Sequence, residues 1–89
     1  MNKNDIVEIF INELRNDSIY SKLGRDIENI IANCFVVEFG YYELNLGSFA
    51  EENFTKAWRI TPANMNYPEA YINDSSGELI YYFNGIIID

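Results

Sequence analysis

Apolar residues recur at helical spacing along the first third of the chain. Residues 5–15 predict an amphipathic helix, and Asp5 with Glu8 three positions later is typical of a capping box at its start. A second apolar stripe contains Gly24, and because glycine destabilises a helix interior by about 1 kcal/mol relative to alanine, we expect a kink or split there. The two segments predict an antiparallel helical hairpin. The apolar positions of the two stripes are Ile6, Val7, Phe10, Ile11, Leu14, Ile19, Leu23, Ile27, Ile30, Ile31 and Cys34.

At Phe35 the hydrophobic period changes from helical to alternating. Residues 35–46, FVVEFGYYELNL, are rich in β-branched and aromatic side chains, but the alternation slips at Gly40. Glycine at such a slip is typical of a β-bulge in one strand or of a tight turn between two short strands. Both interpretations stay open from the pattern alone, and we favour the bulge.

A third helix is predicted near residues 49–59. Ser48 and Glu51 have the spacing of a capping box, with Ser48 as the residue before the helix. The residues that follow place apolar and charged side chains on opposite sides of a helix. The apolar side consists of Ala50, Phe54, Ala57 and Trp58.

The last third of the chain predicts a three-stranded antiparallel meander. Residues 69–73 and 78–83 alternate as strands do, and the polar turn DSSG separates them. Asn84-Gly85 then lies between two hydrophobic runs, which is a strong signal for a type I′ hairpin turn because both positions of that turn need positive φ. The third strand is expected at Ile86–Asp89.

The pattern as a whole predicts an α+β fold in one domain, residues 1–89. An N-terminal helical hairpin and a third helix would pack on a four- to five-stranded antiparallel sheet that ends in the C-terminal meander. Both faces of ELIYYF, residues 78–83, are apolar, so the second face of this sheet needs cover from the loop at 60–68 or from another chain. The predicted core is Ile6, Phe10, Leu14, Ile27, Ile30, Ile31, Phe54, Trp58, Leu79 and Tyr81.

Composition excludes several classes of function. A formal charge of −8 argues against direct binding of nucleic acid or of an anionic membrane surface, since both need clustered basic residues. The chain has no histidine and one cysteine, Cys34, so it lacks the commonest general base, the commonest metal ligand and any intrachain disulfide. No run is apolar enough to span a bilayer, and the N-terminus does not have the pattern of a signal peptide. We therefore expect no cofactor, no metal and no membrane contact, and a location in the cytoplasm.

No local motif indicates catalysis. Asp74, Ser76 and Glu78 have the spacing of part of a calcium loop, but the further oxygen ligands of that motif are missing. Glu38 and Glu43 flank Gly40, and carboxylates on the solvent face of a strand are ordinary. Ser48 is accounted for as a helix cap. Each of these features has a structural interpretation, so we expect that the protein is not an enzyme.

The distribution of charge is more informative than any motif. Residues 1–34 carry a net charge of −2, residues 35–89 carry −6, and no basic residue follows Arg59. Carboxylates interleaved with tyrosines suit a surface that binds a basic protein, because tyrosines supply rigid contact area and carboxylates steer association. The alternative is a solvated acidic face that only maintains solubility. The predicted partner-binding residues are Glu38, Tyr42, Glu43, Glu51, Glu52, Glu69, Asp74 and Glu78.

A small, acidic, histidine-free domain rich in tyrosines and carboxylates resembles immunity proteins that neutralise bacterial nuclease toxins. The resemblance implies a stoichiometric inhibitor that occludes the basic, nucleic-acid-binding cleft of its target. The same profile is similar to phage anti-CRISPR proteins and other nucleic-acid mimics. A hypothesis of another class is a homo-oligomeric structural or adaptor subunit, in which two chains pair through the apolar C-terminal strand. The sequence alone leaves open whether the protein is a monomer or a homodimer.

Overall fold

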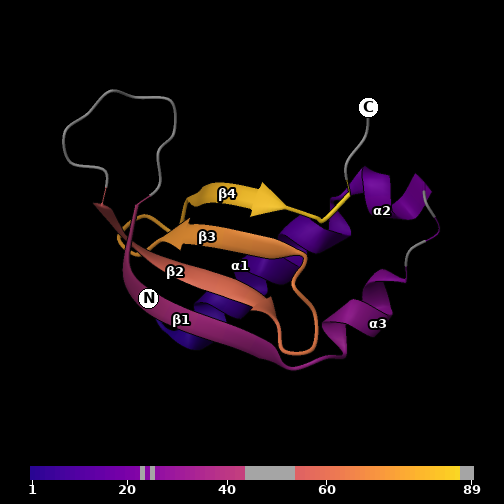
Figure 1. The fold of residues 1–89 in the computed structure, drawn as a ribbon, viewed down its shortest axis with the longest axis horizontal. Coiled ribbons are helices and arrows are strands. Elements are labelled where there is room, and N and C mark those ends of the chain that lie inside the picture. Colours follow the sequence, from indigo (N-terminus) through magenta and orange to yellow (C-terminus); the bar gives the residue numbers. More distant parts are fainter. Residues whose placement is uncertain (23, 25, 44–53, 87–89) are drawn as a thin grey trace.

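The computed structural model describes residues 1–22, 24, 26–43 and 54–86, with the backbone alone at 21, 43 and 54 (Figure 1). Helix α1 (Lys3–Arg15) confirms the first predicted helix but begins two residues earlier than predicted. Asn2 is its N-cap: the Asn2 side chain accepts a hydrogen bond from the Asp5 amide, and the Asp5 carboxylate accepts one from the Asn2 amide. The predicted capping box from Asp5 to Glu8 is therefore wrong, since Asp5 is the second member of a box that Asn2 opens.

The second apolar stripe forms two short helices, as the position of Gly24 predicts. Helix α2 (Ser18–Lys22) and helix α3 (Ile27–Ile31) lie on either side of this glycine, whose φ is +66°. Only glycine adopts this backbone conformation at little cost, so a continuous helix cannot pass through it. Asp26 caps α3 by accepting a hydrogen bond from the Asn29 amide, and α3 packs against α1.

Four strands form one antiparallel sheet in the order β1-β2-β3-β4, which confirms the α+β class. They are β1 (Phe35–Glu43), β2 (Phe54–Pro62), β3 (Glu69–Asn73) and β4 (Leu79–Phe83). Each strand pairs with its neighbour in the sequence, so the sheet is a meander. Figure 1 shows α1 running behind the sheet, with the opposite face turned toward the viewer.

The third helix predicted near 49–59 is wrong over its second half, because Phe54–Pro62 is strand β2. Ala57 and Trp58, which share the apolar side of the predicted helix, belong to opposite faces of a strand. Thr55, Trp58, Ile60 and Thr61 all favour strands, and pairing with both β1 and β3 gives this segment a partner on each side. The predicted capping box at Ser48–Glu51 lies outside the described residues. Among the described residues, the third helix is α3.

Gly40 marks neither a bulge nor a turn, so both interpretations of the slip are wrong. Strand β1 pairs with β2 without a break from Phe35 opposite Pro62 to Glu43 opposite Phe54, and Gly40 lies opposite Ala57. The bulge in this sheet is between β3 and β4, where the register shifts at Tyr71 and Ile72. Residues 44–46 of the predicted strand lie outside the described part of the chain.

The turn DSSG and the two strands beside it are confirmed, but the type I′ turn at Asn84-Gly85 is not. Gly85 has a φ of +83°, whereas no described residue other than glycine has positive φ, so Asn84 lacks the conformation that a type I′ turn requires. The side chain of Asn84 instead accepts a hydrogen bond from the Ile86 amide at 2.8 Å. The rest of the predicted strand Ile86–Asp89 lies outside the described residues.

The core lies between α1 and the face of the sheet that α1 covers. Among the described residues, its buried hydrophobic members include Ile6, Phe10, Leu14, Tyr20, Ile30, Ile60, Ala70 and Ile72. Of the predicted core, Ile27, Ile31, Trp58 and Leu79 are partly buried against it, and the side chain of Phe54 is not described. Tyr81 is wrong as a core residue, since its exposure is 41%. It lies opposite Tyr71, on the face of the sheet that α1 does not cover.

Candidate functional site: the open face of the sheet

The face of the sheet opposite α1 carries aromatic and charged side chains. Ile60, Ala70 and Ile72 are buried in the core, so strand alternation places their sequence neighbours on the other face. The register aligns Glu38, Arg59, Tyr71 and Tyr81 across all four strands. Tyr42 and Glu69 contact members of this row. We call these six residues the open face: Glu38, Tyr42, Arg59, Glu69, Tyr71 and Tyr81.

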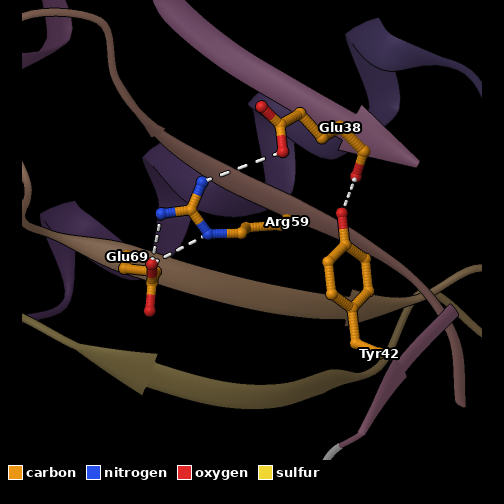
Figure 2. A network of polar contacts seen from close by, with 4 residues as sticks. All are labelled: Glu38, Tyr42, Arg59 and Glu69. Atoms are coloured by element: carbon orange, nitrogen blue, oxygen red, sulfur yellow. Dashed lines mark hydrogen bonds and ion pairs between the residues drawn. The ribbon is translucent and has the colours of Figure 1, made fainter. Parts of the chain in front are cut away.

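Arg59 joins two of the predicted acidic residues, as Figure 2 shows. Its Nε and Nη2 atoms donate to Glu69 Oε2 at 2.9 and 2.6 Å, and its Nη1 atom lies 4.0 Å from Glu38 Oε2. Partial burial lowers the pKa of Arg59, but the hydrogen bonds and charge of Glu69 outweigh it and leave that pKa above its ordinary value. Glu69 is therefore committed to Arg59. The Glu38 side chain, 56% exposed, has only the long contact and remains accessible.

Tyr42 folds back along its own strand and covers Gly40. Its hydroxyl donates to the Glu38 carbonyl oxygen at 3.1 Å (Figure 2), and its ring would touch a Cβ at Gly40 at an ordinary 3.7 Å. An aromatic ring laid over a strand glycine supplies the packing that glycine lacks. Burial, followed by the negative charge of Glu38, raises the pKa of the Tyr42 phenol. The phenol therefore stays neutral near pH 7 and acts as a hydrogen-bonding group.

Three tyrosine rings run in a row across the open face. The ring centroids of Tyr42 and Tyr71 are 5.1 Å apart, and those of Tyr71 and Tyr81 are 6.0 Å apart. Inclined aromatic pairs at these distances attract each other, so each ring restricts the next. The row offers rigid, amphipathic contact area of the kind that protein interfaces use at their centres.

The structure places one of the remaining predicted residues, Asp74, away from this face. Asp74 accepts a hydrogen bond from Trp58 Nε1 at 2.7 Å and lies 3.9 Å from Lys56 Nζ, beside the face that α1 covers. Glu78 is exposed beyond the β3–β4 turn. The side chain of Glu43, and both Glu51 and Glu52, lie outside the described residues. Of the eight predicted residues, the structure thus places Glu38, Tyr42 and Glu69 together.

The predicted set of partner-binding residues does not contain three members of the open face: Arg59, Tyr71 and Tyr81. The position of Arg59 between two carboxylates could not be inferred, because the pattern around it predicts a helix and a helix has no cross-strand neighbours. Tyr81 was assigned to the core because both faces of β4 are apolar in the sequence. Once β2 and β3 are known to pair antiparallel, the opposition of Arg59 and Tyr71 follows from the register.

A second polar cluster, formed by Asp17, Tyr82 and Asn84, joins the helices to β4. Asp17 Oδ2 accepts hydrogen bonds from the Tyr82 hydroxyl at 2.7 Å and from Asn84 Nδ2 at 3.0 Å, and Oδ1 accepts one from the Ile19 amide at 3.0 Å. Burial raises the pKa of Asp17, but these donors outweigh it, and its pKa lies below the ordinary value. Burial, and then the bond to Asp17, raise the pKa of Tyr82 strongly. The polar groups of this Asp17 cluster bind one another, so we assign it a structural role.

Within the described ranges, no three His, Cys, Asp or Glu side chains gather into a group that could hold a metal ion. No helix in the same part of the chain has the length and apolar composition needed to cross a bilayer. Comparison with protein-family models, with curated proteins and with solved structures returned no match. The open face is therefore interpreted from its own geometry, and what that geometry offers is contact area and charge.

Proposed function

We propose that this protein is a stoichiometric inhibitor, an immunity protein that binds a basic, nuclease-type bacterial toxin in the cytoplasm through the open face and occludes its nucleic-acid-binding cleft. The observation that carries the proposal is the row of Tyr42, Tyr71 and Tyr81 beside the accessible carboxylate of Glu38. Tyrosines at the centre of an interface supply binding energy. A net charge of −8 would accelerate association with a basic cleft.

The contacts within the open face divide its acidic residues into two roles. Glu69 holds Arg59 with two short hydrogen bonds, so it positions the arginine and has little capacity for a partner. Glu38 is 4.0 Å from the same arginine, which leaves it able to accept hydrogen bonds from a lysine or arginine of the toxin. We therefore assign Glu38 as the carboxylate that contacts the partner, with the tyrosine row beside it.

Two alternatives share parts of these observations. An anti-CRISPR or other nucleic-acid mimic would use the same acidic surface against a different basic protein. A homo-oligomeric structural subunit would instead pair through the C-terminal strand. The gene neighbourhood separates the immunity protein from the mimic, since a toxin gene beside this one favours an immunity protein and a prophage location favours a mimic.

The experiment measures binding to the purified toxin encoded by the neighbouring gene. Glu38→Lys should slow association and weaken binding by about tenfold or more, because it places like charges together across the interface. Tyr81→Ala should accelerate dissociation, and binding by the unchanged protein should weaken as salt rises. Glu8→Lys, an equal charge change on the exposed side of α1, is the matched control and should leave affinity within a few-fold.

A separate variant reverses Glu51 and Glu52, which tests the predicted residues outside the described part of the chain. If Glu8→Lys abolishes binding while Glu38→Lys and Tyr81→Ala leave it intact, the open face is the wrong surface. If binding is indifferent to salt and to every one of these charges, the acidic surface serves solubility alone.

A further inference from the structure

Strand β1 is a long edge strand whose outer main-chain groups have no partner strand among the described residues. It runs for nine residues, whereas strands in globular proteins are typically about five or six residues long. Natural proteins protect such edges with lysine, proline, bulges or short length. The sequence of β1, FVVEFGYYE, has neither lysine nor proline, and its pairing with β2 has no register shift. The opposite edge, β4, has five residues and a register irregularity.

The hydrogen bonds at the ends of the strands establish which main-chain groups of β1 point outward. The Ala63 amide donates to the Cys34 carbonyl oxygen at 2.8 Å, in continuation of the β1–β2 register. In an antiparallel pair, hydrogen-bonded and non-hydrogen-bonded positions alternate. The even-numbered residues of β1 therefore bond to β2, and the odd-numbered ones direct their N–H and C=O groups away from the sheet. The outward residues are Phe35, Val37, Phe39, Tyr41 and Glu43.

From this pattern we infer that β1 pairs antiparallel with β1 of a second copy of this chain, with Phe39 opposite Phe39 on the two-fold axis. The outward N–H and C=O groups of one β1 must bond to the outward groups of the other β1, so odd-numbered residues of one copy lie opposite odd-numbered residues of the second copy. Of the registers that satisfy this condition, the one centred on Phe39 pairs all nine residues of the strand. It places Val37 opposite Tyr41 and Glu38 opposite Gly40. A shift that centres the pair on Glu38 would oppose two carboxylates, which is unfavourable.

The side chains along this edge fit a second copy. Val36, Phe39 and Tyr41 are 38%, 45% and 69% exposed, and the paired register would place them opposite Tyr42, Phe39 and Val37 of the second copy, all of them apolar or aromatic. The result is one continuous eight-stranded sheet, with both copies of α1 on the same face and the two open faces side by side. Since each copy carries −8, screening by salt should strengthen this association, the reverse of what the proposed basic partner predicts. An experiment that contradicts the proposed dimer therefore leaves the proposed inhibitor function standing, and the reverse also holds.

Cross-linking through introduced cysteines tests the register. In a Cys34→Ser background, Phe39→Cys should form a disulfide-linked dimer under mild oxidation, because opposed residues of a hydrogen-bonded pair have Cα atoms about 5.5 Å apart, within disulfide range. Tyr41→Cys is the matched control: it is the more exposed position, yet its partner is Val37, so it should cross-link at least about tenfold more slowly. Equal cross-linking of both variants would show random collision and overturn the proposed register.

Sedimentation of the unmodified protein over a range of concentrations supplies a second measurement. We expect a reversible dimer that strengthens with salt and becomes a monomer in Tyr41→Pro, since proline there removes an outward N–H and leaves the bonds to β2 intact. Circular dichroism of each variant verifies that the fold is retained. A monomer at every concentration and salt level, or a dimer that survives Tyr41→Pro, would overturn the inference.

Discussion

The Asp17 cluster gives the sharpest prediction about stability. Replacing Asp17 by alanine removes the acceptor of hydrogen bonds from Tyr82, Asn84 and the Ile19 amide. The first two are bonds to a charged group, each worth about 1.5–3 kcal/mol, and the low end applies because Asp17 is half-buried. The third caps α2 and adds about 1 kcal/mol. Asp17→Ala should therefore lower the free energy of unfolding by about 4 kcal/mol, and Tyr82→Phe by about 1.5 kcal/mol.

Urea unfolding of the two single variants and the double variant measures these values. Because Asp17 and Tyr82 share one hydrogen bond of 2.7 Å, the double variant should lose at least about 1 kcal/mol less than the two single variants together. Purely additive losses would show that this bond contributes nothing in solution.

The same cluster predicts the direction of a pH effect. The pKa of Asp17 is lowered in the folded protein, so its contribution is present above the unfolded pKa of about 3.9 and is lost as pH falls through the folded value. The difference between the unchanged protein and Asp17→Ala should consequently shrink in acid. A difference that is the same at pH 7 and pH 2.5 would contradict the assignment of Asp17 as a charged acceptor.

Two further predictions concern the backbone and the core. Gly85→Ala should be more destabilising than Gly24→Ala: both glycines have positive φ, but a Cβ at Gly85 would lie 2.6 Å from the Tyr67 Cβ, whereas a Cβ at Gly24 meets nothing within 4 Å. Equal losses in thermal unfolding would mean that Tyr67 moves aside freely. Ile60→Ala, in the core, should cost about 2–5 kcal/mol, and Tyr81→Ala, on the open face, less than about 1 kcal/mol in urea unfolding. Comparable losses would place Tyr81 in the core after all.

The helical part of the fold could be predicted from the sequence because its signals are local. The apolar spacing of residues 5–15 and the glycine at 24 each depend on neighbours within a few positions, and both predictions are confirmed. Strands β3 and β4 were recognisable for the same reason, since a polar turn separates two short alternating runs. The start of α1 was misplaced because Asn2 and Asp5 are each followed three positions later by an acidic residue, so both fit the pattern of a capping box.

Strand β2 could not be predicted because its stability comes from its partners on either side. In isolation, the segment 54–62 fits a helical stripe about as well as an alternating strand, and pairing with β1 and β3 decides between them. The missing strand also affected the prediction of the candidate site. Without β2, nothing in the sequence indicated that Arg59 lies between Glu38 and Glu69. Charge composition identified the right kind of surface at Glu38, Tyr42 and Glu69, but not the arginine that already occupies part of it.

The neighbour-only order of the sheet has a consequence for how the chain folds. Every strand pairing joins consecutive strands, so the sheet can grow by closing short loops, whose entropic cost is small. The bond between Asp17 and Tyr82 instead joins positions 65 residues apart. Contacts of such sequence separation are slow to form and are gained after local ones. The meander can therefore form one hairpin at a time before the helices pack against it. In that order of events, the hydrogen bonds of the Asp17 cluster form last during folding and break first during unfolding.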